Sequence, residues 1–294
     1  PNISMDDETP SWATLCVLYP AGVESIRIPL DNENHLDGEH MKTNRLMYAV
    51  AFVLLFALGQ PNSASAAEVH VLCSNGLKAV FEELAPQFER ASGHKIVVKF
   101  GLAANFKQQI EAGEVFDLAI LTPAAIDDLI KSGKMAADSR AVIARTGLGI
   151  MIRSGAGKPD VRTTDSFKKA LLDSQSIAFA KEGASGVAFA SLIDRLKITD
   201  ALKSKLKPTA SGEEVNDLVV KGGAQYGILP LSEILAVKGA ELGGMFPPDV
   251  QTYITMATAV SSKAKQPMAA RDLIKFMVAP AATPVIKAKG MERN

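Results

Sequence analysis

The side chains most often used for catalysis are sparse in this 294-residue sequence. Of its four histidines, His70 falls within a predicted strand and His94 beside a predicted turn, where structural or solvated histidines are common. The two cysteines, Cys16 and Cys73, are too few for a disulfide framework or a Cys-rich metal site. Sequence motifs of zinc proteases, serine hydrolases, phosphate loops and CxxC redox sites are all missing. The sequence therefore predicts no catalytic residue, no metal site and no bound cofactor.

An enzymatic alternative rests on two residues, Cys73 or Lys181. A nucleophilic Cys73 needs an activating histidine or a depressed pKa. His70 lies three residues earlier, which places it on the opposite face of a strand. We therefore expect Cys73 to be a small buried hydrophobic residue rather than a nucleophile.

The composition is that of a globular protein, with 47% hydrophobic and 22% charged residues. The 32 basic residues balance the 32 acidic ones. Residues 1–67 hold eight acidic and three basic residues, which leaves 29 basic and 24 acidic residues in 68–294. This mild basic excess is compatible with an anionic ligand and does not indicate a nucleic-acid partner.

Residues 41–67 have the three parts of a secretory signal peptide. Residues 41–45 are positively charged, residues 46–58 form an uncharged apolar run, and residues 63–67 are small. We predict cleavage near Ala67 and export to the periplasm. A signal peptide begins near its charged end, so we predict that residues 1–40 are a non-native upstream extension.

From residue 68 onward, strand-like and helix-like segments alternate, which predicts an α/β fold with a parallel sheet. The pattern restarts near residue 147, so we expect two lobes with a cleft between them. We assign residues 68–150 and 255–294 to lobe 1, and residues 151–254 to lobe 2. The predicted strands are 69–72, 95–100, 118–121, 147–152, 177–180, 226–229 and 252–260, the last being the longest.

Ligands of open parallel sheets bind beyond the carboxyl ends of the strands. Those ends lead into loops at 74–76, 101–105, 181–186 and 229–232, most of which are small or polar and open a helix. Free N–H groups at the start of a helix bind anions. Ser74, Asn75, Asn105 and Ser185 are the polar side chains available there.

Three segments, 71–77, 85–89 and 109–118, resemble the periplasmic molybdate-binding proteins of ABC importers. The block Gln109-Ile110-Glu111-Ala112-Gly113, followed by Phe116-Asp117-Leu118, is the most specific part. This resemblance implies a two-lobed type II periplasmic binding fold with a hinge and a central cleft. It also implies a monomer that delivers its ligand to an ABC permease in the inner membrane and performs no reaction; a periplasmic ligand sensor is the other non-enzymatic alternative.

The same resemblance implies where a ligand binds. The serine positions of the family fall on Gly76 and on Ala103, which Ala104 follows, and the tyrosine position falls on Pro230. Two backbone N–H positions fall on Ser185 and Val215. The lost side-chain donors would each cost about 1.5–3 kcal/mol of binding energy to a charged ligand. The resemblance therefore predicts a small anion, either a molybdate-like oxyanion or an organic carboxylate.

Overall fold

The computed structural model describes residues 12–19, 22–29 and 66–293, and the chain divides into two units, residues 1–64 and 65–294. In the first unit, strands β1 (Trp12–Tyr19) and β2 (Gly22–Pro29) pair antiparallel. This pair lies in the predicted upstream extension. The predicted signal peptide falls outside the described residues, apart from residues 66 and 67.

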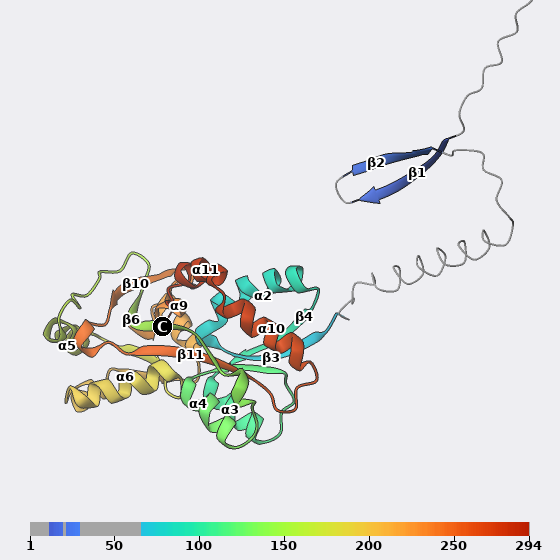
Figure 1. Ribbon diagram of the computed structural model, residues 1–294. Helices are drawn as coiled ribbons and strands as arrows, with labels where there is room; N and C mark the ends of the chain where they lie inside the picture. The colour runs from blue at the N-terminus through green and yellow to red at the C-terminus, as the bar shows by residue number, and fades with distance from the viewer. Residues whose placement is uncertain (1–11, 20–21, 30–65, 294) are drawn as a thin grey trace, which may run out of the picture. The chain divides into compact units, whose positions relative to one another are not determined.

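The second unit is an α/β structure built on nine strands. Ten helices, of which α7 and α9 are single turns, cover these strands (Figure 1). Among the described residues, no helix has the length and apolar character needed to cross a membrane. The strands are β3 (Glu68–Ser74), β4 (Lys95–Gly101), β5 (Leu118–Leu121), β6 (Ala141–Arg153), β7 (Ile177–Ala180), β8 (Leu206–Thr209), β9 (Tyr226–Pro230), β10 (Ala240–Met245) and β11 (Tyr253–Val260). The helices are α2 (Lys78–Ser92), α3 (Ala103–Glu111), α4 (Pro123–Lys131), α5 (Thr164–Asp173), α6 (Ala184–Arg195), α7 (Thr199–Leu202), α8 (Gly212–Val220), α9 (Leu231–Ile234), α10 (Pro267–Val278) and α11 (Thr283–Ala288).

Two sets of three parallel strands confirm the predicted restart of the pattern. β3 pairs in parallel with β4 and β5, and β7 pairs in parallel with β8 and β9. The strands that connect the two sets run antiparallel to their neighbours, so the complete sheet is mixed rather than parallel. Its order is β4-β3-β5-β11-β6-β9-β7-β8, with β10 paired to the side of β6.

Strand β6 belongs to both halves of this sheet. Residues 141–147 of β6 pair with β11, while residues 148–153 pair with β9 and β10. β6 and β11 therefore run between the half that carries α2, α3, α4 and α10 and the half that carries α5 and α6 (Figure 1). Because β6 changes its pairing partners after residue 147, we propose that the two lobes meet within this strand, close to the boundary predicted at residue 150.

The helices form where apolar residues recur at helical spacing. In α2, the buried residues Val80, Phe81, Leu84 and Phe88 share one face, and Gly93 ends the helix with a φ of 75°. This left-handed conformation favours glycine, which is why Gly93 can end the helix there. The buried side chains continue across the sheet, where Phe167 packs against Phe246 with ring centroids 4.7 Å apart.

The structure extends some predicted elements and adds others. β6 has 13 residues and β11 has eight, so the prediction that the strand at 252–260 is the longest is wrong. The first residues of β6 include partly exposed positions, which hide the strand signal. β8 and β10 were not predicted, because β8 is short and largely exposed and β10 contains two consecutive glycines.

Candidate functional site

A cleft of about 430 Å³ opens between the two halves of the second unit. It is lined by the loops that follow the carboxyl ends of β3, β4, β5, β7 and β9, as the sheet predicts. Its walls are dominated by small and apolar side chains. The lining residues are Ser74, Asn75, Gly76, Leu102, Ala103, Ala104, Lys107, Thr122, Ala124, Ala125, Asp128, Ala180, Glu182, Gly183, Ala184, Ser185, Val187, Gly212, Leu229, Pro230, Glu233, Ile254 and Met256.

Four helices, α3, α4, α6 and α8, begin at this cleft. The first intrahelical hydrogen bonds are donated by Phe106 in α3, Ile126 in α4 and Val187 in α6. The N–H groups before these residues have no partner within their helix, and they carry the positive end of the helix dipole. The cleft therefore has several main-chain donors from both halves of the fold.

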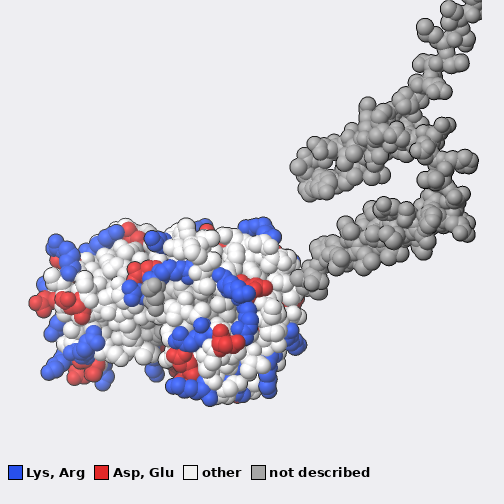
Figure 2. Space-filling view, in the orientation of Figure 1, with Lys and Arg blue, Asp and Glu red and all other residues white. Residues whose placement is uncertain are grey.

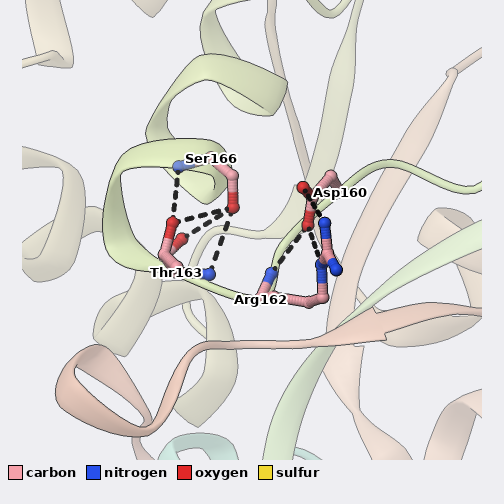
Figure 3. Close-up of polar contacts among 4 residues, drawn as sticks. All are labelled: Asp160, Arg162, Thr163 and Ser166. Atoms are coloured by element: carbon pink, nitrogen blue, oxygen red, sulfur yellow. Dashed lines mark hydrogen bonds and ion pairs between the residues drawn. The ribbon is translucent and has the colours of Figure 1, made fainter.

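Side chains leave most of these helix starts uncapped. The residues that precede α3, α4 and α6 are Leu102, Thr122 and Gly183, and none of them makes a side-chain cap. By contrast, α5 begins away from the cleft with a capping box, in which Thr163 and Ser166 bond to each other's backbone N–H (Figure 3). The starts of α3, α4 and α6 thus have no side-chain cap that occupies their N–H groups.

At α8 the donors differ from the predicted one. Ser211 caps this helix by accepting from the N–H of Glu214 at 3.2 Å, and the N–H of Val215 bonds to the Ser211 carbonyl. Val215 is fully buried and does not line the cleft, whereas Gly212 does. The N–H groups of α8 that can reach the cleft therefore lie about one turn before Val215, at the start of the helix near Gly212.

The structure brings seven of the nine predicted site residues together around the cleft. Ser74, Asn75, Gly76, Ala103 and Ala104 come from one half, and Ser185 and Pro230 from the other. Asn105 and Val215 are not among the lining residues. The side chain of Asn105 is exposed because α3 turns Ala103, Ala104 and Lys107 toward the cleft, although the N–H of Asn105 is one of the free donors at the start of α3.

The one basic residue that lines the cleft in the described part of the chain, Lys107, is already paired. Lys107 lies 3.2 Å from Asp128 and 3.5 Å from Glu111. The hydrogen bond to Asp128 and the two negative charges raise the pKa of Lys107. Elsewhere, basic and acidic side chains are interspersed on the face drawn in Figure 2. The attraction for an anion therefore comes mainly from the helix starts rather than from a free positive side chain.

Glu233 is a cleft residue that sequence reasoning missed. It lies in the short helix α9 directly after the strand β9. Burial raises the pKa of Glu233 to about 7, and the charge of Glu213 adds to this rise, while Lys78 opposes it. The only sequence feature that pointed to Glu233 was its position just after a buried strand. Its burial depends on residues distant in sequence, and local sequence does not reveal such contacts.

The residues of the enzymatic alternative lie outside the cleft lining. Cys73 is fully buried, as predicted, and burial raises the pKa of its thiol, which disfavours the nucleophilic thiolate. Lys181 is exposed. His94 is buried and accepts a hydrogen bond from the N–H of Ala67 at 3.2 Å, which is a structural role. Among residues 66–293, no group of three or more His, Cys, Asp or Glu side chains is placed to hold a metal ion.

Comparisons with known proteins relate this fold and cleft to binding proteins. A family model described as bacterial extracellular solute-binding protein matches residues 69–292. The molybdate-binding protein ModA of Azotobacter vinelandii is 32% identical over 236 residues, which cover 78% of this chain and 91% of that protein. An aconitate isomerase of Pseudomonas sp. is 30% identical over 228 residues, which cover 76% of this chain and 86% of that protein.

Among solved structures, the periplasmic molybdate-binding protein of Azotobacter vinelandii superposes with a TM-score of 0.67 at 21% identity, covering 77% of this chain and 99% of that chain. This likeness confirms the two-lobed fold that the resemblance implied. The family match covers most of the second unit, including both sides of the cleft. The chain therefore belongs to the family of bacterial extracellular solute-binding proteins.

Proposed function

We propose that this protein binds a small organic carboxylate in the cleft and delivers it to an ABC permease, without catalysing a reaction. The observation that carries this proposal is the convergence of uncapped helix starts on one cleft. Main-chain N–H groups at helix starts favour negative charge and are fixed before the ligand arrives. A bound carboxylate would receive hydrogen bonds from both lobes, and hinge closure would then enclose it.

The lining favours a carboxylate over a tetrahedral oxyanion. Gly76, Ala103 and Pro230 stand where the resembling family has hydroxyl-bearing side chains, so the cleft has fewer side-chain donors. A fully dehydrated dianion needs most of its oxygen atoms hydrogen-bonded. Apolar side chains at Leu102 and Met256 suit a carbon skeleton instead. The similarity to a protein named aconitate isomerase supports the same class of ligand.

Export completes this proposal. The signal-like pattern in residues 41–67 would direct the chain to the periplasm and be removed, leaving the second unit to meet the permease. The extracellular assignment of the matching family supports this location. N-terminal sequencing of the exported protein should give a start at residue 67 or 68; an exported chain that still carries residues 41–65 would contradict it.

Thermal unfolding of the full chain tests the ligand class. We expect malate, citrate or cis-aconitate to raise the melting temperature, and molybdate and sulfate to have a much smaller effect. At one hundred times the dissociation constant, binding adds about 2.7 kcal/mol of stability, which is about 5–10 °C for a domain of this size. Stabilisation by molybdate alone would contradict the carboxylate proposal.

A second candidate function is isomerisation of an unsaturated carboxylate. Glu233 favours it, because a cleft carboxyl with a pKa of about 7 can take up and return a proton near neutral pH. Such a reaction would move one proton between two carbon atoms and shift the double bond. Proton NMR of cis-aconitate incubated with the protein distinguishes the two functions: appearance of the trans isomer supports the enzyme, and an unchanged spectrum supports the carrier.

A further inference from the structure

Glu233 stands directly at the start of helix α8. A Cβ atom at Gly212, the first residue of α8, would lie 2.5 Å from Oε2 of Glu233. The carboxyl group therefore occupies the space beside the start of α8, on the wall of the cleft. Among the described residues, it accepts no hydrogen bond, so its oxygen atoms remain available to a bound molecule.

The groups around Glu233 are mostly acidic or neutral. Glu213 faces it from α8 and Lys78 faces it from α2, and these are the charges that act on its pKa. Glu82 of α2 and Asn216 of α8 line an adjoining cavity that Glu233 also borders. Lys78 is thus the one basic group among these lining residues. We call the region around Glu233, Glu213 and Lys78 the acidic corner. When Glu233 is ionised, it repels any anion that enters this corner without a hydrogen to donate.

Asn75 adds a second acceptor to the same corner. Its Nδ2 donates to Oε1 of Glu213 at 3.2 Å and lies 3.4 Å from Oε2 of the same side chain. Asn75 and Glu213 belong to different halves of the fold, so this hydrogen bond joins the two halves. A carboxylate only accepts hydrogen bonds, so the amide nitrogen must face Glu213. This leaves Oδ1 of Asn75 buried and without a partner among the described residues. With Nδ2 turned toward Glu213, Asn75 offers this corner an acceptor rather than a donor.

We infer that Glu233 selects a hydroxycarboxylate, whose hydroxyl group donates to the Glu233 carboxylate while the carboxylate of the ligand binds the helix starts. This inference rests on the proposed function and narrows its ligand class. A hydroxyl group offers one hydrogen, which the Glu233 carboxylate can accept. A molybdate or sulfate dianion offers none, and a site that presents unpaired acceptors rejects a ligand without a donor.

Matched pairs of ligands test the inference on the full chain by calorimetry. Malate and succinate differ by one hydroxyl group, as do citrate and tricarballylate. A hydrogen bond to a charged group makes the hydroxylated member of a pair bind at least about tenfold more tightly. As the pH rises from 6 to 8 and Glu233 ionises, its hydrogen bond strengthens, so the preference for the hydroxyl group should increase.

The variant Glu233→Met removes the acceptor and should reduce the preference to about twofold or less and remove its pH dependence. The control Glu83→Met changes an exposed glutamate of α2 that lines neither the cleft nor the adjoining cavity, and it should leave the preference intact. Equal affinities within both pairs, at both pH values, would overturn the inference while leaving the carboxylate function standing. If no member of either pair binds, the proposed function falls, and the inference falls with it.

Discussion

Replacing Thr122 with aspartate is expected to weaken carboxylate binding at least about a hundredfold without destabilising the protein. Thr122 precedes α4 in an extended conformation, with a φ of −67° and a ψ of 150°, and lines the cleft. An aspartate there can cap α4 and complement its dipole, which adds about 0.5–1 kcal/mol of stability. Two negative charges about 4 Å apart repel by about 4 kcal/mol at an effective dielectric constant of 20, which is more than a hundredfold in affinity.

The control for this prediction is Thr122→Asn, which has the same size as aspartate and caps the helix without a charge. We expect it to weaken binding by only about three- to tenfold, because it competes for N–H groups but does not repel the ligand. Calorimetric titration with malate gives the affinities, and thermal unfolding gives the stabilities. An aspartate variant that binds as tightly as the original protein would show that the start of α4 is not part of the anion site.

Replacing Gly186 with alanine is expected to destabilise the protein by about 3 kcal/mol or more and to abolish ligand binding. Helix α6 passes so close to β7 that a Cβ at Gly186 would lie 1.8 Å from the carbonyl oxygen of Ala180. It would also lie 2.7 Å from the carbonyl carbon of Ala180, so the backbone itself must move. Overpacking of this kind costs about 1–3 kcal/mol where side chains can adjust, and more where they cannot.

Movement of α6 would also displace the N–H groups of Ala184 and Ser185 at the cleft. The matched control is Gly157→Ala, since Gly157 has no atom within 4 Å of the added Cβ. We expect this control to change stability by less than about 0.5 kcal/mol and to bind normally. Urea unfolding measures both variants. Equal stability of the two variants would contradict the close approach of α6 to β7.

Local patterns were sufficient to predict most of the regular elements. The apolar run at 118–121 predicted β5, and the β-rich stretch at 95–100 predicted β4. β10 could not be predicted in this way. It contains Gly243 and Gly244 and exists because it pairs with β6, which is about 90 residues earlier in the sequence. Strands stabilised by such distant pairing carry little local signal.

The candidate site could be predicted where it depends on free main-chain N–H groups, and it could not be predicted where burial changes the chemistry of a side chain. Small or polar residues before a helix indicated the loops at 74–76 and 181–186, because a free helix start follows from local sequence. Glu233 gave no such indication. Its raised pKa comes from burial in the cleft wall and from Glu213, and its carboxyl lies beside Gly212, more than 20 residues away.

The central claim is that free N–H groups at the helix starts hold the ligand's carboxylate. It is tested most directly by recording amide NMR spectra of the full chain with and without malate. The N–H groups of Ala104, Ala124 and Ser185 should shift and become protected from hydrogen exchange, while that of Ser166, which Thr163 already caps, should stay unchanged. Binding of malate with no change at the first three positions would contradict the claim.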